Sequence, residues 1–425
     1  MRPTAIPLQQ DMTLLHLPKQ QGRTGRLTGV LAVPLRQSTA AGYAILPGLL
    51  TRCCRRFPTV TAFSRHLDSL YGATLEGQVT ALGEWQVLVF SASFLNKEYT
   101  LDGRDLAADV TRLLLDTLFD PVLEDGVFRR EDFEQEKRCL LEHLQAEINE
   151  KRLYARRRCK ELLCPDHPFS LNPNGTVETV QALTPAAATE ALQQLLATAR
   201  IHWLYQGETD RDALIKTLEK PFAALPERRA VTLAADSSYT MKESALTEEM
   251  DLRQAKLVLG FRIAATEPDG PVMAARLMNA LWGGCPSSLL FKHVREEQSL
   301  CYYCASSYDR YQGVLLVDSG IEAADAERTK EEVLRWLEAI RQGDFSDEEL
   351  EAARRSLIQR FASLEDTATD REGWYVGQTV YDTYLTPEEA GNQLLAITRE
   401  DVCRAARLVH FDTAYLLKPH EEVAD

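Results

Sequence analysis

MNALWGGCPSSLLFKHVREEQSLCYYCASSYD, residues 278–309, is the stretch that decides the fold of this chain. It begins as an apolar helix that stops at the glycine pair 283–284, because two glycines are costly inside a helix. The spacing predicts a second helix over 289–297, and an aromatic, β-prone run then begins a strand. Arg295 lies in the last turn of that helix and Tyr302 at the start of the strand. One corner can therefore bring a guanidinium and a phenol together.

Two interpretations of this corner are open from these residues alone. Arg295 can be a solvated arginine and Tyr302 a half-buried tyrosine, both serving only the fold. Alternatively, the two side chains form a pair that binds a substrate. The rest of the chain is needed to choose between them.

The totals limit the class of protein. A chain of 425 residues suits two domains or two repeats rather than one core. The net charge of -15 argues against nucleic acid and anionic membranes as partners. No apolar run approaches the length of a membrane span, and the first residues lack the apolar core of a signal peptide. The nine cysteines are an odd, scattered set, which indicates reduced thiols and predicts a cytoplasmic location.

Two segments recur at nearly one offset. DFEQEKRCLLEHL (132–144) matches EELEAARRSLIQR (348–360) at about 216 residues, and LTPAAATEALQQL (183–195) matches ITREDVCRAARLV (397–409) at about 214. Equal order and offset indicate duplication of a unit of about 200 residues. Strands and helices in each unit do not alternate strictly, so the predicted fold class is α+β: two duplicated sandwich domains, each a mainly antiparallel sheet packed with helices.

The predicted domains are 1–225 and 246–425, joined by a polar, unpatterned linker at 226–245. Within the first, Pro47-Gly48 should break the helix predicted over 39–56. The basic run at 151–158 is interpreted as the solvated face of a helix.

With these motifs in place, the sequence resembles the pitrilysin/insulinase superfamily of zinc peptidases, the H-x-x-E-H inverzincins. The resemblance covers nearly the whole chain and is clearest at 278–310, 120–144 and 164–185. The family's second half reads GGG-x-SS-x-LF-x-x-x-RE with a tyrosine seven positions after the arginine. Here the segment is GGCPSSLLFKHVREEQSLCY, and Tyr302 stands seven positions after Arg295.

The first half departs from the family's metal motif. Active members carry H-x-x-E-H on the first helix, so that two histidines face zinc and the glutamate serves as general base. Aligned on Gly42, GYAILPGLLTR places Ile45, Gly48 and Leu49 at the His, Glu and His positions. The distal ligand position falls on His143, or on Glu142 after a shift of one residue.

A catalytic zinc needs three protein ligands. Ile45, Gly48, Leu49 and His143 cannot supply them, so we expect no metal and no cofactor in this chain. The duplicated slot in the first half, 65-RHLDSLYGATL-75, carries Asp68 and Leu75 where the second half has Arg295 and Tyr302. Only the second half keeps a chemically useful pair.

The resemblance implies a function for such a chain. In the superfamily, short bacterial members dimerise, and in some pairs one subunit carries zinc while the other supplies Arg and Tyr. This sequence looks like the second kind, and within it like the zinc-less member of bacterial pairs associated with modification of elongation factor P. The implied role is a zinc-less subunit whose Arg295 and Tyr302 bind substrate and stabilise the transition state for a zinc-bearing homologous partner. The implied substrate is a peptide or unfolded protein.

A scaffold or chaperone-like protein, in which the Arg/Tyr pair is a relic, is the competing hypothesis. A homodimer also stays open. The sequence names neither the partner nor the substrate.

Overall fold

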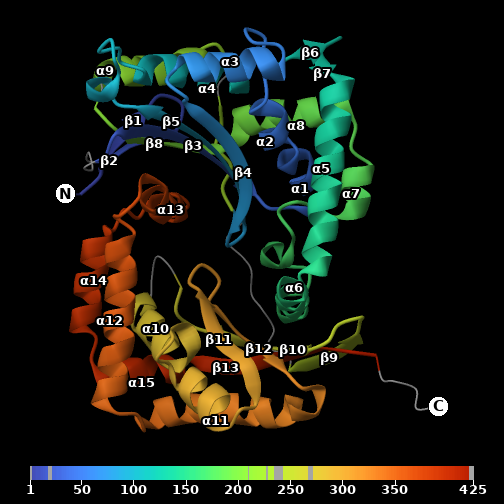
Figure 1. Ribbon diagram of the computed structural model, residues 1–425, viewed down its shortest axis with the longest axis vertical. Coiled ribbons are helices and arrows are strands. Elements are labelled where there is room, and N and C mark those ends of the chain that lie inside the picture. Colours follow the sequence, from blue (N-terminus) through green and yellow to red (C-terminus); the bar gives the residue numbers. More distant parts are fainter. Residues whose placement is uncertain are drawn as a thin grey trace. The chain divides into compact units, whose positions relative to one another are not determined.

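The computed structural model describes residues 2–17, 22–208, 210–225, 228–233, 243–266 and 271–420 (Figure 1). The chain divides into two compact units. Unit 1 comprises Met1–Gln145, Leu171–Ala235 and Thr367–Thr386. Unit 2 comprises Ala146–Ser170, Asp236–Asp366 and Pro387–Asp425.

Unit 1 is built on a six-stranded sheet of order β1-β2-β8-β3-β5-β4. Its strands are β1 (Thr4–Leu8), β2 (Met12–Leu17), β3 (Thr24–Pro34), β4 (Thr74–Leu82), β5 (Trp85–Leu95) and β8 (Arg200–Gln206), beside a small hairpin of β6 (Leu123–Glu124) and β7 (Val127–Phe128). Its helices are α1 (Gln37–Ala44), α2 (Leu46–Leu50), α3 (Val60–Ser69), α4 (Ala107–Phe119), most of α5 (Arg130–Asn149), α7 (Val177–Gln181), α8 (Pro185–Thr198), α9 (Arg211–Phe222) and α13 (Ala368–Thr379).

Unit 2 is built on a five-stranded sheet of order β11-β12-β10-β13-β9. Its strands are β9 (Ser244–Glu249), β10 (Ala255–Ile263), β11 (Cys301–Asp309), β12 (Val314–Ile321) and β13 (Val409–Lys418). Its helices are α6 (Lys151–Leu163), α10 (Val272–Asn279), η3 (Ala280–Gly284), η4 (Leu290–Glu297), α11 (Ala326–Gln342), α12 (Asp347–Ser363), α14 (Pro387–Ala396) and α15 (Arg399–Arg407). Short 3₁₀ turns lie at Lys97–Tyr99 in unit 1 and at Pro168–Ser170 and Ala323–Asp325 in unit 2.

The two sheets share one plan, which confirms the predicted duplication and the α+β class. Read from one edge, β4-β5-β3-β8-β2 corresponds to β11-β12-β10-β13-β9. In both, the first three pairings are antiparallel and the last is parallel. Strand β1 adds a sixth member to the first sheet by pairing antiparallel with β2.

Alternating side chains give each sheet two covered faces, as the two-residue period of a strand requires. On β3, Leu27, Leu31 and Val33 enter the main core of unit 1, which also contains Trp203 and Phe90. Arg26 and Thr28 point to the opposite face and are also buried. That second face of the sheet is covered by α13, which lies against β3 and β8 (Figure 1).

Helix α13 is joined to the sheet by a buried ion pair. Glu372 accepts hydrogen bonds from the Arg26 guanidinium and from the Thr28 hydroxyl, and the Ser91 hydroxyl donates to its Oε1 at 2.8 Å. Arg26 Nη1 also donates to Ser93 Oγ at 2.6 Å. A carboxylate buried this deeply needs such partners, because an unpaired charge in a low-dielectric interior is costly.

Unit 2 repeats this arrangement with the charges reversed. Helix α6 lies on β10 and β13 and buries Ala155, Cys159 and Leu163 against the sheet. Asp318 of β12, 1% exposed, accepts hydrogen bonds from Arg152 and Arg156 of α6. The interpretation of the basic run as a solvated face was therefore wrong for these two arginines, because a buried carboxylate of the sheet lies opposite them.

The helices α6 and α13 occupy equivalent places in the two repeats. In the sequence, α6 lies between α5 and α8, and α13 lies between the equivalents of these helices, α12 and α15. The predicted domains 1–225 and 246–425 thus differ from the compact units in two segments, 146–170 and 367–386. Each half of the chain contributes one helix to the sheet of the other half. The predicted linker lies partly, at 226–227 and 234–242, outside the described residues.

Other features agree with the sequence in part. The helix predicted over 39–56 is interrupted, but at Ile45 rather than at Pro47-Gly48, because a proline is tolerated in the first turn of α2. All nine cysteines are free thiols. Within the described ranges, no helix combines the length and the low charge of a bilayer-spanning segment.

The Glu372 ion pair gives a direct test of the exchanged helix. Replacing Glu372 with alanine leaves Arg26 buried without its carboxylate, and we expect the free energy of unfolding to fall by about 3–5 kcal/mol. Glu134→Ala, at an exposed position of α5, is the matched control and should change it by less than about 0.5 kcal/mol. Urea denaturation of the full chain measures both, and equal effects of the two variants would contradict the assignment.

Candidate functional site

The degenerate metal positions lie at the junction of α1 and α2. Ile45 separates the two helices, and Gly48 and Leu49 lie in α2. Ile45 is 2% exposed and Leu49 is 4% exposed, and both belong to the main hydrophobic core of unit 1. Where a metal site would hold two imidazoles, this chain packs two aliphatic side chains.

Gly48 lies directly against a carboxylate of α5. A Cβ atom at this position would lie far inside van der Waals contact with Glu136 Oε2. A glutamate at position 48, as the peptidase motif has, would therefore require Glu136 to move. The glycine is thus matched to the position of its neighbour.

An arginine binds the carboxylates beside these positions. Arg52 Nη1 donates to Glu136 Oε1 at 2.6 Å, and Arg52 Nε lies 3.6 Å from Asp132 Oδ1. Asp132 also forms an ion pair of 2.6 Å with Arg129. Guanidinium groups therefore neutralise the negative charge of Asp132 and Glu136. The pairing of Arg52 with these two acids was not predicted from the sequence.

The distal position does not complete a metal site. His143 is exposed, with its Nε2 3.4 Å from Asn174 Nδ2, and Glu142 is exposed as well. Across the part of the chain that the structure describes, no group of three His, Cys, Asp or Glu side chains is placed to hold a metal ion. A zinc ion needs three such ligands, so the residues at these positions do not fit it.

Arg295 and Tyr302 flank one tight turn in unit 2. Arg295 is in the last turn of η4, and Tyr302 is the second residue of β11. Between them Ser299 adopts a left-handed conformation with φ of 53°, and the Leu300 amide donates to the Val294 carbonyl at 3.1 Å. These constraints fix where the strand starts relative to the helix, so the seven-residue spacing has a structural basis.

The two side chains are exposed and contact different partners. The Arg295 guanidinium lies over the Phe291 ring, 4.6 Å from its centroid, and has no carboxylate partner among the described residues. Tyr302 is 63% exposed, and its hydroxyl donates to Glu322 Oε1 at 3.1 Å. The corner predicted from the sequence is present, but no hydrogen bond joins Arg295 to Tyr302.

The hydrogen bond to Glu322 raises the pKa of Tyr302, because the nearby carboxylate disfavours the phenolate. The phenol therefore stays protonated across the neutral range. It remains able to donate a hydrogen bond.

The helices before the turn are unusually wide. Both η3 and η4 are π-helices, a type often found at functional sites. Gly283 lies so close to β11 that a Cβ there would meet the Ser306 amide nitrogen at 2.9 Å. Gly283 is therefore required by the approach of this helix to the strand, whereas Gly284 lies against Asn279 of the preceding helix.

The corresponding corner of unit 1 has no such pair. Asp68 is exposed near the end of α3, and Leu75 of β4 packs against the hydrophobic core. In both sheets this corner leads into an edge strand, since β4 pairs with β5 and β11 pairs with β12 at the ends of the strand orders. The two halves share the geometry of the corner but not its chemistry.

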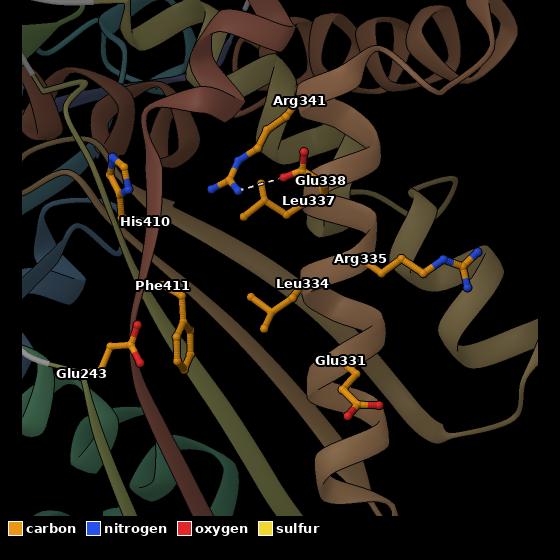
Figure 2. Close-up of a pocket in the computed structure, with 9 residues that line it drawn as sticks. All are labelled: Glu243, Glu331, Leu334, Arg335, Leu337, Glu338, Arg341, His410 and Phe411. Carbon is orange, nitrogen blue, oxygen red and sulfur yellow. Dashed lines mark hydrogen bonds and ion pairs between the residues drawn. The ribbon is translucent and has the colours of Figure 1, made fainter.

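A groove of about 640 Å³ also lies in unit 2, between α11 and β13 (Figure 2). Leu334 and Phe411 line its apolar part, and Glu338 and Arg341 pair across 3.0 Å at its end. None of its lining residues belongs to η4 or β11. The groove is separate from the Arg295/Tyr302 corner.

Comparison with known proteins finds a family model that is similar to part of the chain. Residues 182–357, which include Arg295 and Tyr302, match the family model described as Peptidase M16 inactive domain. This segment is similar to the M16 peptidases, which supports the resemblance to the pitrilysin/insulinase superfamily that the sequence showed.

Particular relatives are similar over most of their length. A Bacillus subtilis (strain 168) protein, "Probable inactive metalloprotease YmfF", is 28% identical over 411 residues, covering 96% of each chain. "Uncharacterized zinc protease YmxG" of the same strain is 23% identical over 74% of this chain and 76% of its own. A conserved Enterococcus faecalis V583 protein has the same fold, with a TM-score of 0.92, 24% identity and 100% coverage of both chains. A Pseudomonas fluorescens peptidase M16 inactive domain follows at a TM-score of 0.78, 17% identity and coverage of 99% and 98%.

The residues at the metal positions predict that the purified chain binds no stoichiometric zinc. Metal analysis after dialysis should find far less than one zinc per chain, and incubation with zinc before a second dialysis should not change this. One tightly held zinc per chain would contradict the assignment of Ile45, Gly48, Leu49 and His143 as a degenerate site.

Proposed function

We propose that this chain is a catalytically incomplete, zinc-less subunit of a two-subunit M16-type metallopeptidase. It supplies Arg295 and Tyr302 to the active site of a zinc-bearing homologous partner. The substrate is a peptide or an unfolded protein. The zinc of this enzyme belongs to the partner subunit.

The contrast between the two candidate sites carries the proposal. At the metal positions, aliphatic packing and the Arg52–Glu136 ion pair leave no ligand set. At the other corner, Arg295 is an exposed guanidinium without a carboxylate partner in the described chain, and Tyr302 is an exposed, protonated phenol. The chain therefore lacks a metal site but has an accessible arginine and tyrosine. This combination is what a subunit needs if it completes the active site of a zinc-bearing partner.

Each side chain has a defined chemical role in this proposal. The Arg295 guanidinium binds a substrate carbonyl or a terminal carboxylate, for which its planar donors are suited. The Tyr302 hydroxyl exchanges Glu322 for the substrate and donates to the oxyanion that develops on the cleaved carbonyl. Donors placed at a developing oxyanion are among the largest contributions to enzyme catalysis.

The edge strand β4 offers a second means of binding peptide. Its burial alternates from Thr74 to Val79, and its described strand partner is β5 alone, so one row of its backbone groups has no strand partner. An extended peptide can add to such an edge by main-chain hydrogen bonds. This supports a peptide or unfolded protein as substrate.

The relatives are consistent with pairing. Bacillus subtilis (strain 168) contains both the homologue named as inactive and the homologue named as a zinc protease. Chains of the two kinds therefore coexist in one organism. The proposed complex is a cytoplasmic heterodimer with no nucleic-acid or membrane partner, and a link to elongation factor P modification stays a prediction of the sequence resemblance.

A scaffold or chaperone-like protein is the alternative. It is favoured by one observation: the Tyr302 hydroxyl already has a partner in Glu322. A homodimer is the matching alternative for assembly. Substitutions at the corner separate these functions.

Tyr302→Phe removes only a hydroxyl from an exposed ring. We expect folding and pairing to be unchanged, while cleavage of internally quenched peptides by the mixed subunits falls by about 100-fold or more, the usual effect of one lost oxyanion donor. Arg295→Ala should weaken substrate binding as well as turnover. Thermal melting of each variant accompanies the assay, with Tyr99→Phe and Arg355→Ala as exposed control positions.

Full activity of both variants at an unchanged melting temperature would exclude the catalytic role and favour the scaffold. Absence of any activity gain when the wild-type chain is added to the zinc-bearing homologue would exclude the subunit function.

A further inference from the structure

Strand β11 brings two cysteines to the same face of the sheet. Residues three apart on a regular strand point to opposite faces. Here a bulge intervenes, since Cys301 is opposite Ile321 and Cys304 is opposite Ser319, two ladder steps further on. Tyr302 is the inserted residue of this bulge. The extra residue therefore turns Cys301 and Cys304 to one side.

The two thiols are neighbours on one face of the sheet and are enclosed. Cys301 is 7% exposed and Cys304 is 4% exposed. Interaction with the Cys304 thiol lowers the pKa of Cys301, and the charge of Arg295 acts in the same direction. Interaction with Cys301, together with burial, raises the pKa of Cys304. Cys301 is thus the thiol more readily ionised, and Cys304 is its protonated neighbour.

Other buried thiols of the chain differ in this respect. Burial raises the pKa of Cys53, Cys54 and Cys159. Thiolate character governs the reactivity of cysteine, so these three thiols are expected to be inert. A neighbouring pair on one face of the sheet, with opposite pKa shifts, is the arrangement of an attacking and a resolving thiol.

We propose that Cys301 and Cys304 form a reversible disulfide that closes across the bulge carrying Tyr302. This disulfide regulates the Arg295/Tyr302 corner. The regulatory role rests on the proposed function, whereas formation of the disulfide does not. The oxidant is a peroxide and the reductant is a dithiol.

The chemistry balances within the pair. The Cys301 thiolate attacks one oxygen of hydrogen peroxide, and the O–O bond breaks to give a sulfenic acid and, after protonation, water. Cys304, giving up its proton, then attacks the Cys301 sulfur, so that the S–S bond forms and a second water leaves. Two thiols are oxidised and one peroxide is reduced, and a dithiol reverses the change.

The disulfide would act on Tyr302 because the two sulfurs flank it in the chain. Closing the bond fixes the backbone on both sides of the inserted residue. It also removes the ionisable thiol of Cys301, whose charged form would interact with Arg295. Oxidation is expected to lower peptide cleavage by the paired subunits.

The test uses the full chain with Cys139→Ser, which removes an exposed thiol. Hydrogen peroxide should yield a product lacking two hydrogens, and peptide mapping without reduction should link Cys301 to Cys304. Dithiothreitol should reverse both. In Cys304→Ser, Cys301 should stop at the sulfenic acid, which dimedone traps. Recovery of both peptides in reduced form, under peroxide that oxidises Cys139 of the unmodified chain, would overturn the proposal without bearing on the proposed function.

A second measurement addresses regulation. Cleavage by the mixed subunits should fall after oxidation and recover with dithiothreitol. The pair containing Cys304→Ser cannot form the disulfide, so its cleavage should not show this fall and recovery. Formation of the disulfide with unchanged activity would overturn the regulatory part and leave the modification site standing.

Discussion

A buried charge on each sheet, met by a helix from the other half of the chain, is the constraint on which this structure depends. Arg26 in the first sheet binds Glu372 of α13, and Asp318 in the second binds arginines of α6. Because the two pairs have opposite polarity, either helix placed on its own half's sheet would bring like charges together. Such a misplacement would cost more than a lost contact, since buried like charges repel in a low dielectric. The ion pairs therefore specify the exchange as well as stabilising it.

The same electrostatic requirement explains how a chain of this class can lack a metal motif. The acidic residues Asp132 and Glu136 lie beside the positions where ligands would stand, and Arg52 binds them. A guanidinium supplies the positive charge that these carboxylates need, and Gly48 leaves room for one of them. The first unit can then keep its fold with an aliphatic core at Ile45 and Leu49. No comparable replacement is found at the second corner, where Arg295 and Tyr302 remain exposed.

Much of the fold could be predicted from the sequence because it depends on local patterns. The repeated segments predicted the duplication, and Pro47-Gly48 predicted an interruption of the helix that is now α1 and α2. The spacing of Arg295 and Tyr302 predicted the turn between the helix and the strand that carry them. The exchange of α6 and α13 could not be predicted, since it depends on long-range pairs such as Arg26–Glu372 that leave no periodic signal. The basic run of α6 was misinterpreted for the same reason. The placement of Cys301 and Cys304 on one face depends on the bulge, which the C-x-x-C spacing alone does not predict.

The central claim is that this chain completes the active site of another subunit, and crosslinking at Tyr302 tests it most directly. A photo-crosslinking benzoylphenylalanine is placed at position 302, or at exposed position 99 as a control, and irradiated with a peptide substrate. The account predicts that position 302 crosslinks to the peptide only when the zinc-bearing homologue is present, and that position 99 does not. Equal crosslinking at 302 with and without that homologue, or none in a pair that binds the peptide, would contradict it.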